Sequence, residues 1–163
     1  MTERLLGLAL PDDFKELLRV IPAGKYAGTV LVQPPTSTGH VGDLAYLYRE
    51  VLKTLRSPQG RSRKYAVYPE LPGLLPWGKS FRAPAAYVFW LADQGDPNEW
   101  PVVLVDTAFT RWEQYDVGAV EFLIALVKGQ LPSDIAPSAE GSPRYKTYQD
   151  LEGAPSNQEA AGG

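Results

Sequence analysis

The sequence predicts an α+β fold, in which helices pack against a single, mostly antiparallel sheet with a central meander of strands. Two short apolar runs, Ala86–Ala92 and Val102–Val105, flank a segment rich in turn-forming residues and indicate paired strands. Two longer segments, Asp43–Ser57 and Val117–Leu131, have the apolar patterns of helices. The 163 residues correspond to about one domain.

The first helix is predicted within Leu8–Ile21. Pro11 and the two aspartates after it favour a helix start, because acidic side chains stabilise the positive end of the helix dipole. The next apolar residues recur at i, i+3, i+4 and i+7 and form one stripe: Phe14, Leu17, Leu18 and Ile21. The segment after this helix, Thr29–Gln33, is rich in β-branched residues and predicts a short strand.

The middle of the chain combines a helix with two short strands. In Asp43–Ser57 the apolar side chains keep the helical period, and Asp43 can cap the N-terminus. Lys64–Pro69 and Leu74–Lys79 are predicted as short strands. Pro76 predicts an edge position or a bend for the second of them, since proline has no amide hydrogen for a sheet ladder.

The central hairpin is the most distinctive part of the sequence. Ala86–Ala92 has no polar residue on either side of the pleat, which predicts a central strand with both faces covered. The linker Asp93–Pro101 is too short for a parallel crossover, so the pairing with Val102–Val105 must be antiparallel. Arg111–Asp116 can add a third strand to this meander.

Val117–Leu131 is predicted as the last helix, buried on most sides against the sheet. The composition then changes to alternating proline, serine and small residues. We therefore predict a globular domain over residues 1–131 and a Pro/Ser-rich C-terminal extension over residues 132–163, disordered from about residue 152.

Composition narrows the classes of function. The absence of cysteine excludes disulfides, thiolate nucleophiles and zinc–cysteine sites. A net charge of −3 disfavours nucleic-acid binding, and no apolar run is long enough to span a membrane. With no phosphate-binding loop, no metal-binding motif and no signal peptide, we expect a cytoplasmic protein without a cofactor, a metal site or catalytic activity.

The acidic residues near the predicted strand ends allow two interpretations. Asp93, Asp96 and Glu99 lie in or beside the segment DQGDPN, and paired carboxylates could serve a hydrolase or hold a divalent cation. However, aspartate, asparagine, glycine and proline are also the residues that turns require. The turn interpretation is the stronger one, and the hydrolase stays an alternative.

The tryptophans also allow two interpretations. Trp90 lies within the central apolar run and is predicted to be core. Trp77, Trp100 and Trp112 lie near strand ends, where they either pack in the core or act as anchors for a protein partner.

The order of these features resembles the SUKH superfamily, which includes fungal cell-wall-assembly regulators and many bacterial immunity proteins. The most specific motifs are LLPWG and DPNEWPVV. The resemblance covers about residues 8–131 and rests on these segments: Leu10–Leu17, Ala23–Val32, Leu74–Gly78, Tyr87–Asp93, Asp96–Val103, Trp112–Tyr115 and Glu121–Leu131.

This resemblance implies a SUKH-like α+β fold, no catalytic activity, and a role as an immunity protein that neutralises a cognate, nuclease-type toxin by direct binding. The alternative is a regulatory or scaffold module that binds a host protein. We expect a monomer or weak dimer whose candidate contacts are the acids and tryptophans near the hairpin: Trp77, Asp93, Asp96, Glu99, Trp100 and Trp112. The chain departs from the family pattern in lacking most of the helix that usually precedes the LP motif.

Overall fold

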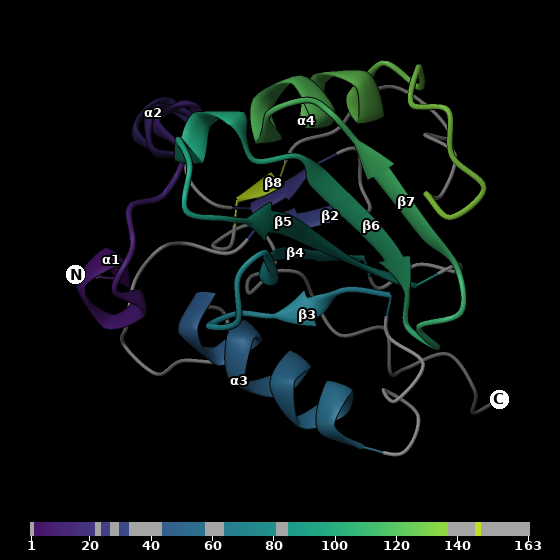
Figure 1. Ribbon diagram of the computed structural model, residues 1–163. Coiled ribbons are helices and arrows are strands. Elements are labelled where there is room, and N and C mark those ends of the chain that lie inside the picture. The colour runs from purple at the N-terminus through teal and green to yellow at the C-terminus, as the bar shows by residue number, and fades with distance from the viewer. Residues whose placement is uncertain are drawn as a thin grey trace, which may run out of the picture.

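The computed structural model describes residues 2–21, 24–26, 30–32, 44–57, 64–80, 85–136 and 146–147. The predicted disorder from about residue 152 lies outside these ranges. The described residues form an α+β fold, with one mostly antiparallel sheet and helices on both of its faces (Figure 1). Among them, no helix is long and apolar enough to cross a membrane.

The sheet has the strand order β7-β6-β5-β4-β2-β1-β8, and β3 pairs in parallel with β4 at one end. All other pairs are antiparallel. The strands are β1 Gly24–Tyr26, β2 Val30–Val32, β3 Ala66–Val67, β4 Gly73–Ser80, β5 Ala86–Ala92, β6 Val102–Asp106, β7 Trp112–Tyr115 and β8 Lys146–Thr147. The predicted meander is confirmed as β5–β6–β7, whereas β1 and β8 were not predicted.

The helices lie in two layers. Helices α2 and α4 cover one face of the sheet and α3 covers the other (Figure 1). Their bounds are α1 Thr2–Leu6, α2 Asp12–Val20, α3 Leu44–Arg56 and α4 Ala119–Val127, and a short 3₁₀ helix, η2, spans Pro97–Glu99. The three longer helices confirm the predicted ones, and the short α1 was not predicted.

Strand β5 is central, as its sequence predicted. It pairs with β4 on one side and β6 on the other. Its side chains alternate between two cores: Val88 and Trp90 pack under α2 and α4, while Tyr87 and Phe89 pack under α3. Burial of such a large apolar side chain contributes roughly 1.5–3 kcal/mol, so this strand fixes both helical layers.

Pro76 lies at a bulge in strand β4. β4 lies between β5 and β2, but β2 pairs only with Gly78–Ser80 and β3 only with Gly73 and Leu74, so no described strand pairs with Pro76 on that side. The register with β5 shifts between Pro76 and Gly78, which leaves Trp77 as the extra residue. Because a bulge interrupts the ladder, it accommodates a residue that lacks an amide hydrogen. Pro76 therefore lies both at the predicted bend and at a stretch of β4 that is locally an edge among the described strands.

The chain packs on the domain beyond α4. Ile135 is completely buried in the core under α2 and α4, and β8 pairs with β1 at the far end of the sheet. The domain boundary after Leu131 stays a prediction, but some of the residues that follow it contribute to the fold.

Candidate functional site

The predicted acidic residues gather on the connection between β5 and β6, where side-chain hydrogen bonds fix the turn. Asp93 Oδ1 accepts from the Gly95 amide at 2.7 Å and from Trp100 Nε1 at 3.1 Å. Asp96 caps η2 by accepting from the Asn98 amide at 2.9 Å. Both carboxylates, and that of Glu99, remain exposed. The turn interpretation thus accounts for the local bonds of Asp93 and Asp96.

Asn98 connects this turn to the start of α2. Its Oδ1 accepts from the Asp12 amide at 2.7 Å, and its Nδ2 lies 3.3 Å from Asp12 Oδ2. Figure 1 shows the connection lying beside α2. The Lys15 ammonium, 2.8 Å from Asp12 Oδ1, and then the Asn98 amide lower the pKa of the Asp12 carboxyl. We call the exposed surface formed by Asp12, Asp93, Asp96 and Glu99 the acidic tip.

Helix α2 also caps α4. Asp13 Oδ2 accepts from the Val120 amide at 3.2 Å, and no side chain of α4's own N-cap residue, Gly118, can do so. A Cβ atom at Gly118 would lie 2.8 Å from Asp13 Oδ2, so glycine is what permits this approach. The carboxylate also suits the positive end of the α4 dipole. Asp12 of the acidic tip and Asp13 are adjacent in α2. The tip is therefore connected to α2 directly and to α4 through Asp13.

Removing the Asp13 carboxylate should destabilise the protein modestly. We expect Asp13→Ala to lower the free energy of unfolding by about 1 kcal/mol, since the Val120 amide loses its acceptor. For a chain of this length that corresponds to a decrease of about 2–4 °C in Tm, measurable by circular dichroism. The control is Glu16→Ala, which removes only an exposed ion pair with Arg19. Equal Tm values for the two variants would contradict the capping role.

The three candidate tryptophans differ in how far their side chains are exposed. Trp77 is completely buried and Trp100 is 3% exposed, so neither offers a surface for a partner to touch. Trp77 lies on the same face of β4 as Leu75, in the core under α2 and α4, and its ring stacks on Trp90 with centroids 5.5 Å apart. Trp100 positions Asp93 through its indole N–H. We therefore remove Trp77 and Trp100 from the predicted contacts and keep Trp112, which is only partly buried.

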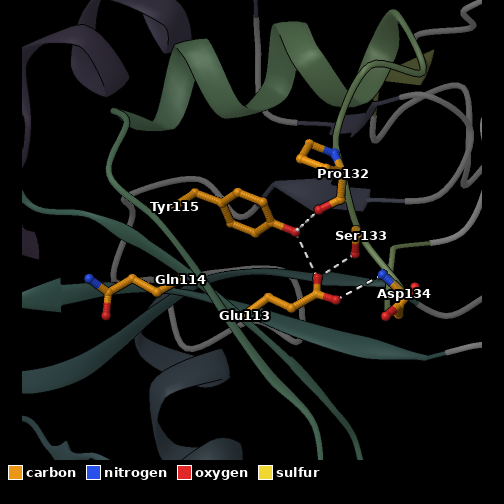
Figure 2. Close-up of a pocket in the computed structure, with 6 residues that line it drawn as sticks. All are labelled: Glu113, Gln114, Tyr115, Pro132, Ser133 and Asp134. Carbon is orange, nitrogen blue, oxygen red and sulfur yellow. Dashed lines mark hydrogen bonds between the residues drawn. The ribbon is translucent and has the colours of Figure 1, made fainter.

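A second concave region, which the sequence did not predict, lies beside β7. It is a pocket of about 620 Å³ between β7 and the segment after α4 (Figure 2). Its lining residues are Glu113, Gln114, Tyr115, Pro132, Ser133 and Asp134. We call this pocket the β7 groove. Nothing in the sequence near Glu113 indicates that residues 132–134 return to it.

The Glu113 carboxylate organises the β7 groove. It accepts from the Tyr115 hydroxyl at 2.7 Å, from the Asp134 amide at 2.8 Å and from the Ser133 hydroxyl (Figure 2). Burial, together with the neighbouring Glu113 carboxylate, raises the pKa of the Tyr115 phenol, so this hydroxyl stays protonated and donates at neutral pH. Because all three donors are neutral groups, they hold the carboxylate in place without cancelling its charge.

Neither region is an assembled metal site. Among the residues that the structure describes, no group of three or more His, Cys, Asp or Glu side chains is arranged to hold a metal ion. No family model, no curated protein and no solved structure matches this chain. The resemblance to the SUKH superfamily therefore rests on the sequence motifs alone.

Proposed function

We propose that this chain is a non-catalytic, cytoplasmic protein-binding domain, and specifically an immunity protein that neutralises a cognate nuclease-type toxin by direct binding. The SUKH-like motifs support this proposal, as does the α+β architecture. We further propose that the protein acts as a monomer or weak dimer and binds neither nucleic acid nor membrane.

The acidic tip is the observation that carries the proposal. Its carboxylates are exposed, and hydrogen bonds hold those of Asp93 and Asp96 in one arrangement. A preorganised negative surface attracts a cationic partner and loses little conformational entropy on binding. Nucleases that bind phosphate backbones present such cationic surfaces. Such a surface could therefore occlude the site at which a nuclease binds its substrate.

The local bonds of these carboxylates favour binding over hydrolysis. Asp93 and Asp96 each accept from groups of the same turn, through Gly95 and Asn98 respectively. A general acid or base needs a pKa shifted by its surroundings and a cleft that holds a substrate. The hydrogen bonds of the turn explain the positions of both side chains, so no catalytic role is needed to account for them.

Co-expression with a toxin encoded beside the gene tests the proposal. We expect the chain to restore growth of cells that produce the toxin, and the two purified proteins to elute as one complex on a sizing column. Failure to protect cells together with no complex would contradict the toxin-binding function. A gene neighbourhood without any toxin would instead favour the regulatory or scaffold module.

The acidic tip itself is tested by changing one charge at a time. Glu99→Gln removes an exposed tip carboxylate, and Glu50→Gln removes a carboxylate that is also exposed, from α3 on the opposite face. We expect Glu99→Gln to slow association with the toxin by about two- to fivefold at low salt, and Glu50→Gln to have little effect. Equal rates for both variants at low salt would show that the tip does not steer binding.

A further inference from the structure

Among the residues that the structure describes, strand β7 forms an open edge of the sheet. No other described strand than β6 pairs with it. The bond from the Asp106 amide to the Arg111 carbonyl, at 3.2 Å, shows which backbone groups of this part of the chain face β6. In an antiparallel ladder, alternate residues bond to the same partner strand. The backbone N–H and C=O groups of Trp112 and Gln114 therefore point away from β6. No described residue donates to them or accepts from them.

The two sides of this edge differ in chemistry. On the side of α4 lies the β7 groove, with the Glu113 carboxylate held inside it and Asp134 exposed at its wall. Arg111, the residue before β7, is directed to Asp106, with Nε 3.6 Å from Oδ2, and to the Asp134 carbonyl, with Nη1 3.3 Å from that oxygen. The groove thus keeps a negative charge beside backbone groups that point away from β6.

The side of α3 presents aromatic rings. The Trp112 and Tyr65 rings pack edge to face with centroids 5.7 Å apart, and the Tyr65 hydroxyl donates to Gln114 Oε1 at 3.0 Å. Both rings are only partly buried. The surface formed by the Trp112 and Tyr65 rings can cover an apolar side chain of a bound strand that lies opposite Trp112.

We propose that the open edge of β7 binds an extended, basic segment of a partner protein, which adds an antiparallel strand to the sheet. This inference rests on the protein-binding function proposed above and names the kind of segment recognised. Residues of the added strand opposite Glu113 are Lys or Arg and enter the β7 groove. Residues opposite Trp112 and Gln114 are apolar and exchange backbone hydrogen bonds with them.

Charge favours such a segment over a second copy of this chain. The edge carries Glu113 and Asp116, with Asp134 beside it. Pairing of two β7 strands with Glu113 opposite Glu113 would bring two carboxylates together across the new interface, and like charges on opposed strands are destabilising. A basic strand places opposite charges there instead.

A model peptide tests the geometry directly. The probe is a blocked nine-residue peptide in which lysine and valine alternate, titrated into the ¹⁵N-labelled full chain. We expect the largest chemical-shift changes at the Trp112 and Gln114 amides. N-methylation of the valines, which lie opposite Trp112 and Gln114, should weaken binding at least about tenfold, because each lost hydrogen bond changes affinity by about two- to tenfold. N-methylation of the lysines should change it little, and replacing lysine by glutamate should abolish binding.

Two protein variants distinguish the contribution of the Gln114 backbone amide to peptide binding from that of the Gln114 side chain. Gln114→Pro removes the outward N–H without breaking the ladder to β6, and Gln114→Ala keeps that N–H while removing the bonds of the side chain. We expect only the proline variant to lose peptide binding, with both variants folded by circular dichroism. The N-methylated peptides give the same comparison on the unaltered protein if the proline variant does not fold.

The possible outcomes distinguish this inference from the proposed function. No binding of the lysine–valine peptide, or equal weakening by both methylated peptides, overturns the inference whatever the toxin experiment gives. If Gln114→Pro still protects cells from the toxin, the edge is not the toxin contact, although the immunity function stands. A dimer of the unaltered chain in sedimentation equilibrium that Gln114→Pro dissociates assigns the edge to a second copy and overturns the basic segment.

Discussion

Replacing Trp77 with alanine is expected to lower the free energy of unfolding by about 3–5 kcal/mol. The indole is completely buried, stacks on Trp90 and meets Phe14 and Phe122 edge to face, with centroids 5.7 and 6.0 Å away. Phe14 and Phe122 belong to α2 and α4, so truncation would leave a cavity where both helices meet the sheet. Domains of this kind are stable by about 5–15 kcal/mol, so the loss is a large fraction of the total.

Urea unfolding followed by circular dichroism measures this effect without depending on tryptophan fluorescence. Trp112→Ala is the matched control, because it removes the same side chain from a partly buried position at the edge of the sheet. We expect it to cost less than half as much. Trp77→Phe should also cost less than alanine, since it keeps a ring and removes an indole N–H that has no acceptor among the described residues. Equal midpoints for Trp77→Ala and Trp112→Ala would contradict the central role of Trp77.

Trp77 illustrates a limit of predicting side-chain positions from sequence. A tryptophan next to proline and glycine near the end of a predicted strand is compatible with an exposed anchor and with core packing. The choice depends on whether both faces of β4 are covered, and they are, because α2 and α4 cover one face of the sheet and α3 covers the other. The neighbouring strand β5 was predictable, since an apolar residue at every position leaves both faces buried whatever the register.

The acidic tip was predictable in its local parts only. Asp93 and Asp96 bond to residues two positions ahead, and such turn patterns are visible in the sequence. The contact of Asn98 with Asp12 joins residues 86 positions apart, and the cap that Asp13 gives to α4 spans 107. These depend on how α2 lies across the sheet, which hydrophobic periodicity does not determine.

The β7 groove could not be predicted because its two walls belong to segments of different character. The sequence indicates β7 as a strand, but the residues after α4 are rich in proline and serine and predict an extension. What returns them to the sheet is the Glu113 carboxylate, which accepts from the Asp134 amide and the Ser133 hydroxyl, and the burial of Ile135. A carboxylate that accepts backbone amides has no sequence signature when its donors lie 21 residues away.

The second large effect is expected from Asp106, whose carboxylate builds the turn between β6 and β7. The residue is 8% exposed. Its Oδ1 accepts from the amides of Thr110 and Arg111, at 2.7 and 3.1 Å, and its Oδ2 accepts from the Thr110 hydroxyl at 2.6 Å. The same turn holds Phe109 at a φ of 58°, a conformation that needs support from its surroundings in a non-glycine residue.

We expect Asp106→Ala to lower the free energy of unfolding by about 2–4 kcal/mol, because the Thr110 and Arg111 amides lose their acceptor in a partly buried turn. Asp106→Asn should lose less, since its side-chain oxygen can still accept from both amides. Urea unfolding at neutral pH measures both variants, with Glu99→Ala as a control that removes an exposed carboxylate. A loss for Asp106→Ala no larger than that for Glu99→Ala would contradict this account of the turn.

The same carboxylate should make stability depend on pH. Burial alone would raise the pKa of Asp106, but the hydrogen bonds from Thr110 and Arg111 outweigh it and hold the pKa below its ordinary value. A carboxyl whose pKa is lower in the folded state stabilises the fold above the pKa of the unfolded chain, about 3.9, and loses that contribution as pH falls through the folded value. The difference in unfolding free energy between the native protein and Asp106→Asn should therefore be constant near neutral pH and shrink below about pH 4. A difference that stays constant down to pH 2 would show that the Asp106 charge contributes nothing to the turn.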